Sequence, residues 1–435
     1  MSVLSKLKSL IHFLLAWVAY WRYGRPARQL IVIGVTGTKG KSTTCRLIAS
    51  VLEAGGYKVG LLSTVEFQIG GKRWLNDQKM TMLGRGQIQK MLRDMVRAGC
   101  QYAVVETSSE GILQYRHCGL KYDVAVFTNL GAEHSERHGG FENLKKAKSK
   151  LFASLKAPRK HLFGREVSKV IIVNADDAQA SFYQSFSADV YWAYSLKNAA
   201  VAPPVERADG RISQATDTGT IFTANGEEYQ LNIVGDFNVN NALAAIAVGY
   251  SQGIAPEKMR RGILLVSTVP GRMEFIEAGQ NFKAVVDYAH EPMSYVALFT
   301  TLRSVVTPGK GKVIVVIGSD GGGRDTGKRG AMGEIAGRLA DYVVVSDVNC
   351  FDDDPREIAE MLAAGARRAG KIDGENLFII IDRREGIHKA LSLARPGDIA
   401  AVTAKGTEPW IAVGQGEKIP WDDRQVVREE IQKFL

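Results

Sequence analysis

Residues 30–44, LIVIGVTGTKGKSTT, place a glycine-rich turn directly after an apolar segment. The segment 30–35 is rich in β-branched residues, which is typical of a strand buried on both faces. A helical pattern follows the turn and continues to about residue 54. A strand, such a turn and a helix bring backbone N–H groups and a helix N-terminus to one point, where they can bind an anion. The sequence therefore predicts a phosphate-binding loop rather than an ordinary surface turn.

The residues of this turn have distinct predicted roles. Gly37 and Gly40 allow the backbone to close tightly around a phosphate group. Lys41 is expected to reach the β- and γ-phosphates of ATP, and the Ser42 hydroxyl is expected to hold Mg²⁺. We predict that the whole turn binds ATP: Gly37, Thr38, Lys39, Gly40, Lys41, Ser42 and Thr43.

The length, the charge and the cysteines limit the class of protein. A chain of 435 residues should contain two or three domains. The formal net charge is +10, and half of this excess lies in the first 29 residues, which hold no acidic residue: Lys6, Lys8, Arg22, Arg25 and Arg28. The rest is only mildly basic, so we expect no nucleic-acid partner. The cysteines form no C-x-x-C motif, which excludes a zinc ribbon and argues against a disulfide framework in a cytoplasmic protein that uses ATP.

Residues 1–29 have the pattern of an amphipathic helix. Apolar side chains recur at helical spacing at Leu4, Leu7, Ile11, Leu14, Val18 and Trp21. The apolar core, residues 10–23, is shorter than the ~20 residues that a membrane-spanning helix requires, and no small-residue cleavage site follows it. Two interpretations stay open: the helix lies on the inner face of the membrane and makes a cytoplasmic protein peripheral, or it packs on its own domain.

The rest of the chain has an α/β pattern in two parts. Strand-like and helix-like segments alternate over residues 30–269, which predicts a P-loop central ATP-binding domain with a mainly parallel sheet. Pro270 and Gly271 mark a boundary, and a second alternating series over residues 270–435 predicts a smaller Rossmann-like α/β domain. No glycine fingerprint follows its first strand, so a dinucleotide site is not predicted there.

Two side chains that can bind a metal lie at the ends of neighbouring predicted strands. Glu106 ends the segment YAVVE, and His134 ends DVAVFTNLGAEH. Because ligands bind at the carboxyl ends of strands in such sheets, both can reach a Mg²⁺ held by Ser42. Each also has a simpler interpretation, Glu106 as a helix-capping carboxylate and His134 as a loop histidine. Their occurrence together beside a phosphate loop favours metal binding.

Several motifs in order, from about residue 30 to the C-terminus, resemble those of one enzyme family. The turn TGTKGKST has the spacing of Mur ligases and folylpolyglutamate synthetases rather than G-x-x-x-x-G-K-S. The other motifs are similar to Mur ligases of the MurE type: ETSSEGILQYR, FTNLGAEHSERHGGFENLKKAKSKLF, VPGRMEFI, VVDYAHEP, GSDGGGRDTGKRGAMGEIA and AKGTEPWIAVGQGEKIPWDDRQVVREEI. The resemblance implies an ATP-dependent ligase that adds an amino acid to a muramoyl-peptide-like acceptor, through an acyl phosphate, in cell-wall synthesis.

The resemblance also implies roles for individual residues. The catalytic set would be Lys41, Glu106, His134 and Lys148, and two Mg²⁺ ions would be held by Ser42, Glu106, His134 and Lys148, the last as a carbamate formed with CO₂. Further contacts to ATP would come from Asn238, Arg272, Asp287, Tyr288 and His290. The acceptor and the incoming amino acid would meet Thr81, Ser108, Ser109, Gln114, Arg116, Arg324, Lys328 and Glu408. Judged from the residues alone, Lys148 is one of four lysines in KKAKSK, and a solvated surface position is the simpler interpretation.

Three features depart from the MurE pattern. The family's N-terminal uridine-binding domain is expected to be absent, because 29 residues cannot replace it. SDVNCFDDDPRE stands where the family has D-N-P-R, so recognition of diaminopimelate is not predicted. The family's Ser-Ser-His reads Ser108-Ser109-Glu110, which alters one position of the acceptor site. The added amino acid and the carrier of the acceptor are left open.

Two other functions are compatible with parts of the sequence. A ligase that builds a polyglutamate or another peptide tail would share the turn, but the segment ETSSEGILQYR argues against it. A non-catalytic cell-wall scaffold, anchored by its first helix, would have no reason to retain a metal site. We therefore predict an enzyme whose partners are a muramoyl-peptide-like acceptor and a free amino acid.

Overall fold

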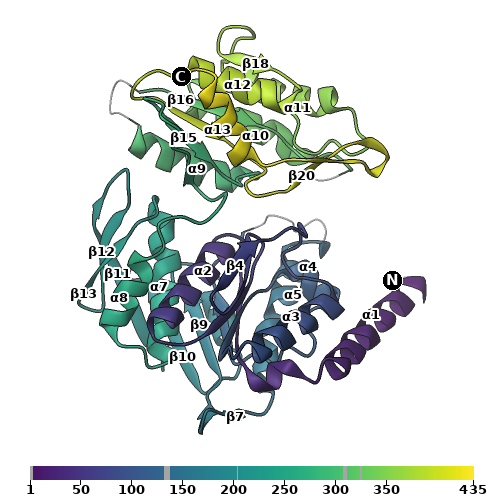
Figure 1. The fold of residues 1–435 in the computed structure, drawn as a ribbon, viewed down its shortest axis with the longest axis vertical. Coiled ribbons are helices and arrows are strands. Elements are labelled where there is room, and N and C mark those ends of the chain that lie inside the picture. The colour runs from purple at the N-terminus through teal and green to yellow at the C-terminus, as the bar shows by residue number, and fades with distance from the viewer. Residues whose placement is uncertain (1–2, 132–137, 203, 307–310, 324–325) are drawn as a thin grey trace. The chain divides into compact units, whose positions relative to one another are not determined.

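A computed structural model of the chain describes residues 3–131, 138–202, 204–306, 311–323 and 326–435, with side chains from residue 10 onward. The chain divides into two compact units, Met1–Ser267 and Thr268–Leu435 (Figure 1). Each unit contains a β-sheet covered by helices, which confirms the predicted α/β class.

The first unit is built around an eleven-stranded sheet in the order β13-β12-β11-β10-β9-β6-β1-β5-β2-β3-β4. The strands from β11 to β2 in this order are parallel, and antiparallel strands extend both edges, so the predicted mainly parallel sheet is confirmed. The strands are β1 (Ile31–Thr36), β2 (Val59–Leu62), β3 (Glu66–Ile69), β4 (Lys72–Leu75), β5 (Tyr102–Glu106), β6 (Val124–Phe127), β9 (Val170–Asn174), β10 (Val190–Ser195), β11 (Glu206–Ala215), β12 (Thr220–Ala224) and β13 (Glu227–Leu231).

Strand β1 lies between β5 and β6 and aligns their ends. All of its residues are buried, as expected for a β-branched strand covered on both faces. Val35 pairs with Glu106 of β5 and with Val126 of β6. The carboxyl ends of the three strands therefore lie side by side, and the segments that follow them start at the same edge of the sheet.

Helices cover both faces of this sheet. On one face α2 (Lys41–Ala54), α7 (Asp236–Ser251) and α8 (Pro256–Leu264) pack against one another. On the other face α3 (Arg85–Arg97), α5 (Phe141–Ala153) and α6 (Ala180–Gln184) share a core with alternate strand residues, in which Leu92, Leu151 and Tyr183 pack with Val105 and Phe127. Short elements complete the unit: α4 (Ser109–Leu113), β7 (Lys160–Leu162), β8 (Arg165–Val167), η1 (Pro26–Gln29) and η3 (Ser154–Lys156).

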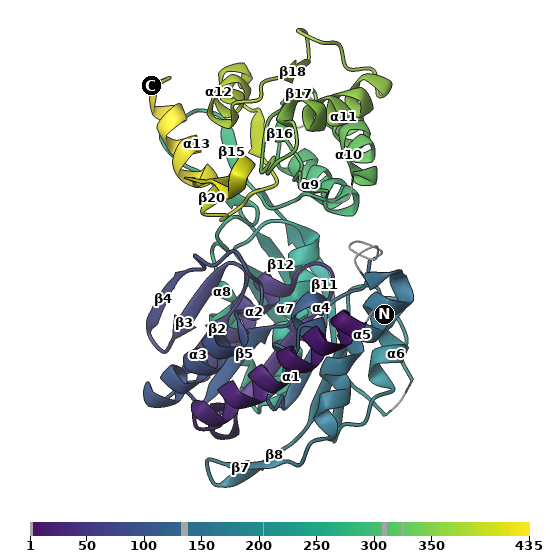
Figure 2. The same ribbon diagram turned by 90° about the vertical axis from the view of Figure 1, so that its right-hand side faces the viewer.

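Helix α1 (Val3–Arg22) belongs to the first unit and packs against α3 (Figure 2). Among the described residues no helix is long and apolar enough to cross a membrane. Contact of residues 1–29 with a membrane surface stays a prediction.

The second unit contains a six-stranded sheet in the order β14-β15-β19-β16-β17-β18, in which only the edge strand β14 is antiparallel. Helices lie on both faces; α12 and α13 share the core of one face with residues such as Ile314 and Val402. The strands are β14 (Glu274–Phe275), β15 (Lys283–Val286), β16 (Val313–Ile317), β17 (Tyr342–Val345), β18 (Leu377–Ile379) and β19 (Ile399–Val402), with a separate pair β20 (Trp410–Ala412) and β21 (Lys418–Pro420). The helices are α9 (Pro292–Val305), α10 (Gly327–Leu339), α11 (Pro355–Arg368), α12 (Arg383–Leu393), α13 (Asp423–Gln432) and the short η4 (Gly414–Gly416).

Gly262 of α8 allows a close contact with α2, the helix that follows the phosphate turn. A Cβ atom there would lie 2.7 Å from Val51 Cα and 2.9 Å from Ser50 O. Gly262→Ala should push the helices apart and lower the free energy of unfolding by about 1–3 kcal/mol, seen as a lower thermal midpoint. Gly86→Ala in α3, where the added methyl group meets open space, is the control and should leave the midpoint unchanged or raise it. Equal midpoints for the two variants would contradict the close contact.

Candidate active site

The phosphate turn connects the carboxyl end of β1 to α2. Gly40 is the N-cap of α2 and has a left-handed backbone with φ of 80°, which favours glycine. A Cβ atom at Gly40 would collide with Asn241 Oδ1 of α7, and one at Gly37 would collide with Thr128 Oγ1. The turn thus passes so close to α7 and to the end of β6 that glycine is required at both positions.

Asn129, which follows β6, binds the middle of the turn. The backbone N–H groups of Thr38 and Lys39 donate to Asn129 O and Oδ1, each at 2.8 Å, and Asn129 Nδ2 donates to Lys39 O at 3.0 Å. These contacts shape the turn. The backbone donors that remain for a phosphate group include the N–H groups of the first turn of α2, which have no acceptor within the helix. Sequence analysis did not single out Asn129, although it lies at the same sheet edge as Glu106.

The Glu106 carboxylate lies at the base of the turn and is 2% exposed. Its Oε2 atom accepts hydrogen bonds from Ser42 Oγ at 2.9 Å and from Thr64 N at 2.7 Å, and Oε1 accepts one from Thr64 Oγ1 at 2.9 Å. It does not cap α4, because Ser108 Oγ accepts the hydrogen bond from Gly111 N at that helix end. The simpler interpretation of Glu106 as a helix cap is therefore wrong, and the structure brings Ser42 and Glu106 together.

Lys148 of α5 points into the same site. Its side chain is 4% exposed, and Nζ donates to Gly37 O at 2.8 Å. Burial, and next the charge of Lys41, lower the pKa of Lys148 well below its ordinary value, although Glu106 opposes this shift. The other lysines of this stretch, Lys146 and Lys150 among them, are more exposed. Lys148 is thus no solvated surface lysine but a buried amine beside the phosphate turn.

Ser42 and Glu106 suit Mg²⁺ in their ligand chemistry, because hydroxyl and carboxylate oxygens are its usual protein ligands. The amine of Lys148 does not suit a cation, whereas a carbamate at this position would. His134 lies outside the described residues. Within the part of the chain that the structure describes, no three His, Cys, Asp or Glu side chains are grouped to hold a metal.

The residues expected to contact the acceptor lie mainly around α4. Gln114 Oε1 accepts a hydrogen bond from Arg116 Nη2 at 2.7 Å, and Arg116 Nη1 donates to Met82 O at 2.5 Å. Ser109 is buried, and Ser108 caps α4. Thr81 lies near the Glu106 network, because its Oγ1 is 3.0 Å from Thr64 Oγ1.

Sequence analysis missed Thr64 and Arg85 in this region. Thr64 follows β2 at the sheet edge where Glu106 ends β5, and this position is the signal that could have found it. Arg85 Nε donates to Gln114 O at 2.9 Å. Burial, and next the nearby Arg116, lower the pKa of Arg85. The guanidinium groups of Arg85 and Arg116 thus both lie near Gln114, which favours an anionic ligand there.

Asn238 of α7, expected in the ATP site, is buried in a hydrogen-bonded chain. Its Nδ2 donates to Val234 O at 2.7 Å, and its Oδ1 accepts from Asn241 Nδ2 at 3.0 Å. Asn241 Oδ1 in turn accepts from Thr44 Oγ1 of α2 at 3.1 Å. The contacts of Asn238 therefore connect α7 to the helix of the phosphate turn.

In the second unit, the residues expected to bind the nucleoside lie together after β15. Asp287 accepts hydrogen bonds from Met273 N and Ala289 N, each at 2.7 Å. The Arg272 guanidinium lies 4.2 Å from the Tyr288 ring centre, a cation–π contact. The His290 ring is 4.6 Å from the same ring, and its Nδ1 donates to Tyr288 O at 2.7 Å. These groups form an aromatic and charged surface within this unit.

Glu408 lies in a polar network of the second unit. Its Oε2 accepts hydrogen bonds from Asn349 Nδ2 at 3.0 Å and from Lys405 Nζ at 3.1 Å. Lys405 is fully buried, and sequence analysis missed it together with Asn349. Lys328 Nζ forms an ion pair with Glu291 Oε1 at 2.5 Å. Arg324 lies outside the described residues.

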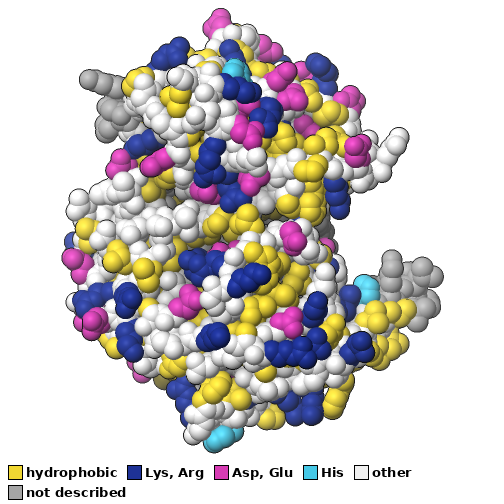
Figure 3. All heavy atoms as spheres, in the orientation of Figure 1, with side chains coloured by type: hydrophobic (Ala, Val, Ile, Leu, Met, Phe, Trp, Pro, Cys, Tyr) yellow, Lys and Arg dark blue, Asp and Glu magenta, His cyan; other side chains and the backbone are white. Residues whose placement is uncertain are grey.

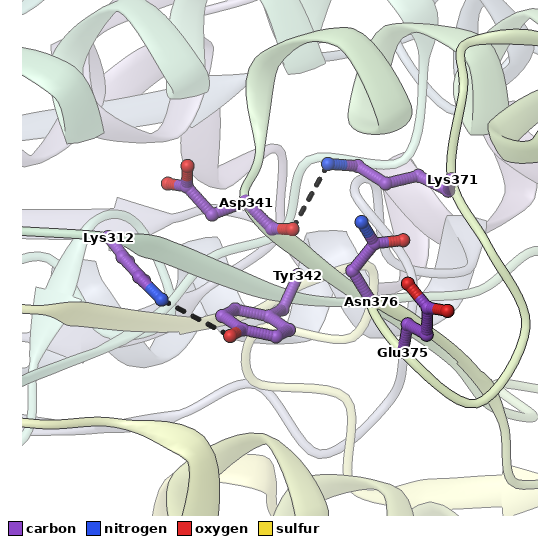
Figure 4. A pocket seen from close by; sticks show the side chains of 6 residues that line it. All are labelled: Lys312, Asp341, Tyr342, Lys371, Glu375 and Asn376. Atoms are coloured by element: carbon purple, nitrogen blue, oxygen red, sulfur yellow. Dashed lines mark hydrogen bonds between the residues drawn. The ribbon is translucent and has the colours of Figure 1, made fainter.

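A hollow of about 400 Å³ in the second unit lies where the amino ends of its strands meet (Figure 4). Lys312 Nζ donates to Tyr342 Oη at 3.2 Å, and Lys371 Nζ donates to Asp341 O at 3.0 Å. Lys312 precedes β16, and Asp341 and Tyr342 lie at the start of β17. The other lining residues precede β18: Lys371, Glu375 and Asn376. Because ligands of such sheets bind at the carboxyl ends, we do not assign this hollow to the site.

Comparisons with known proteins match both units. Residues 35–249 match the Mur ligase middle domain, and residues 271–406 match the Mur ligase, glutamate ligase domain. The UDP-N-acetylmuramyl-tripeptide synthetase of Roseiflexus sp. is 39% identical over 415 residues, which cover 94% of this chain and 80% of that protein. The UDP-N-acetylmuramoyl-L-alanyl-D-glutamate--2,6-diaminopimelate ligase of Parabacteroides distasonis is 35% identical over 412 residues, 95% of this chain and 80% of that protein.

Solved structures have the same fold. A UDP-N-acetylmuramoyl-L-alanyl-D-glutamate--2,6-diaminopimelate ligase aligns with a TM-score of 0.61 and 29% identity over 93% of this chain and 79% of that one. A Mycobacterium tuberculosis folylpolyglutamate synthase complexed with ADP aligns with a TM-score of 0.63 at 18% identity, covering 90% and 91% of the two chains, a likeness that shows the fold alone. The two domain matches and the sequence identity to its relatives show that this chain belongs to the Mur ligase family.

Proposed function

We propose that the protein is an ATP-dependent ligase that adds an amino acid to a muramoyl-peptide acceptor and releases ADP. Its family and its relatives, a UDP-N-acetylmuramyl-tripeptide synthetase among them, support this reaction. The observation that carries the proposal at the site is the 2.9 Å hydrogen bond between Ser42 Oγ and the buried Glu106 carboxylate, beside the phosphate turn. A hydroxyl and a carboxylate in this place are what Mg²⁺-bound nucleotide requires.

The reaction joins a carboxylate to an amine in two steps. An oxygen of the acceptor carboxylate attacks the γ-phosphorus of ATP, the bond to the bridging oxygen breaks, and ADP leaves. The amine of the incoming amino acid then attacks the acyl carbon, inorganic phosphate leaves with the electron pair of the C–O bond, and a proton is released. The acceptor and ATP are both anionic, so Lys41 and the N-terminus of α2 are proposed to lower their repulsion. When bound by Ser42 and Glu106, Mg²⁺ would neutralise further phosphate charge.

Lys148 is proposed to act as a carbamate. Its neutral amine would attack CO₂, a C–N bond would form, and one proton would be released, so that a cationic or neutral group becomes anionic. Three observations support this role: the side chain is buried, its pKa is lowered, and its Nζ reaches Gly37 O of the phosphate turn. An anionic group at this position would suit Mg²⁺ and would offset the charge of Lys41.

The remaining assignments are proposals that rest on grouping. Around α4, the acceptor would meet Thr81, Ser108, Ser109, Gln114 and Arg116, and we add Arg85 because it binds Gln114 O. In the second unit, the cation–π contact of Arg272 with Tyr288 and the edge-on contact of His290 with the same ring support nucleoside binding there, with Asp287 beside them. The polar network around Glu408 supports a role in binding the amino group of the incoming amino acid. Lys328, which pairs with Glu291 in the same unit, is proposed to meet an anionic group of the substrates.

An assay of ADP release tests the reaction class. With ATP, Mg²⁺ and a uridine-linked muramoyl dipeptide, repeated turnover and continued ADP release should require an amino acid, and a screen across amino acids identifies the substrate. A folyl-glutamate acceptor is the control and should release no ADP above background. ADP release with the folyl-glutamate acceptor but not with the muramoyl dipeptide would contradict the proposed acceptor class.

Lys41→Ala and Glu106→Gln test the phosphate and metal assignment. Lys41→Ala removes a cation that offsets phosphate charge, and Glu106→Gln removes an anionic ligand of the Mg²⁺ that accompanies ATP. In each case kcat should fall by about 10²–10³ or more, the scale of losing one electrostatic contact in a transition state. Glu106→Gln keeps the size of the side chain, and circular dichroism should show unchanged folding. Lys146→Ala, an exposed lysine on α5, is the control and should keep full activity. Activity near that of the unaltered protein in either test variant would refute the assignment.

Lys148 has a test that does not depend on turnover. Protein incubated with ¹³CO₂ should show a carbamate signal by ¹³C NMR, and Lys148→Ala should lose it while Lys146→Ala retains it. Because burial lowers the pKa of Lys148, its amine is neutral over a wider pH range than that of a surface lysine, and labelling should persist at lower pH. Short carboxylic acids should partly restore the activity of Lys148→Ala. A signal that survives in Lys148→Ala would contradict the proposal.

A further inference from the structure

Helix α1 has two different faces, and the inner one is attached to the first unit. Ala16, Ala19 and Tyr20 are buried. The Tyr20 ring packs so close to Gly119 that a Cβ atom there would lie 2.8 Å from it. The Phe13 ring meets the ring of Tyr115 edge-on, with centroids 5.6 Å apart. The helix is therefore held in a defined orientation by one side only.

The outer face of α1 is apolar and exposed. Four large side chains lie along it at spacings of four, four and three residues, which places them in one line. Their exposed fractions are 53% for Leu10, 52% for Leu14, 61% for Val18 and 62% for Trp21, and Ile11 and Leu15 lie beside them at 46% and 51%. Figure 3 shows hydrophobic side chains along this helix at the surface. Contiguous exposed apolar surface of this kind marks an interaction site.

The surroundings of this face are cationic. Arg22 and Arg28 are exposed, and the Arg25 guanidinium lies 4.7 Å from the Trp21 ring centre. Lys121 Nζ lies 5.8 Å from the ring centre of Trp17 on the same helix. The sequence contains no Asp or Glu before Glu53, so no acidic side chain of residues 1–52 balances these charges. An apolar line beside an excess of cations fits an anionic partner.

We propose that the outer face of α1 binds the surface of an anionic lipid bilayer, with the helix axis parallel to the membrane plane. Leu10, Leu14, Val18 and Trp21 would enter the region between headgroups and acyl chains, while Arg22 and Arg28 would meet lipid phosphates. A second copy of this chain is a poorer occupant, because it would bring the same cations to the same face, and like charges repel. The helix is already folded against α3, so binding requires little further ordering.

Vesicle co-sedimentation of the full chain tests this proposal. Binding should be strong with vesicles of phosphatidylglycerol and phosphatidylcholine, at least tenfold weaker with phosphatidylcholine alone, and weakened by 0.5 M salt. The double variant Leu14→Asn/Val18→Asn should lose at least tenfold in partitioning. The matched control, Leu265→Asn/Ile372→Asn, removes apolar side chains that are 60% and 52% exposed elsewhere and should bind as the unaltered protein does.

Two pairs of arginine variants test how much the positive charge contributes to lipid binding. Arg22→Gln/Arg28→Gln should lower partitioning several-fold, whereas Arg211→Gln/Arg356→Gln, which removes two exposed arginines elsewhere, should not. All these positions are exposed, so the thermal midpoint should stay constant, and it is measured for each variant. Equal partitioning of the α1 variants and their controls would overturn the proposal. The proposal would also be overturned if sedimentation velocity showed a dimer that Leu14→Asn/Val18→Asn dissociates. The outer face of α1 would then bind a second copy of this chain.

Discussion

The site depends on a carboxylate buried at the end of β5. Removing a charge from water is costly unless hydrogen bonds or opposite charges compensate for it. Glu106 accepts hydrogen bonds from Ser42 Oγ, Thr64 N and Thr64 Oγ1, all uncharged donors. A carboxylate has about four acceptor positions, so these three bonds leave capacity for one more partner. The fold thus holds an anionic group in place beside the phosphate turn, where a divalent cation would complete its environment.

The position of Lys148 adds a second electrostatic constraint. Burial lowers the pKa of its amine, and the nearby charge of Lys41 lowers this pKa further, against the opposing effect of Glu106. Loss of the proton removes the repulsion, and reaction with CO₂ would reverse the sign of the charge. A site that must hold triphosphate, a divalent cation and a carboxylic acid is better balanced by an anion at this position. The charge balance of the site is thus a physical reason for a carbamate at Lys148 and at no other lysine of α5.

Particular residues show how far the sequence could predict this protein. The strand, turn and helix around Gly37 were predictable because their periodicity, glycines and cations are local. Glu106 could be placed because it ends a strand of the same sheet. Lys148 was singled out only by the resemblance to the MurE type. The residues by themselves could not distinguish it from its neighbours, because its burial comes from packing of α5 against the turn, a contact between residues 111 positions apart. Thr64, Asn129 and Lys405 were missed for the same reason, since polar residues after strands become part of a site only when the strand order is known. The two faces of α1 likewise follow from packing on α3, whereas its amphipathic spacing was visible in the sequence.

Glu106 and Ser42 are proposed to hold the metal that accompanies ATP. Isothermal titration of ATP into the protein, with and without Mg²⁺, measures this directly. We expect Mg²⁺ to raise the affinity of the unaltered protein for ATP, and Glu106→Gln to remove most of this Mg²⁺ dependence without weakening the binding of metal-free ATP. The same Mg²⁺ dependence in Glu106→Gln and in the unaltered protein would contradict it.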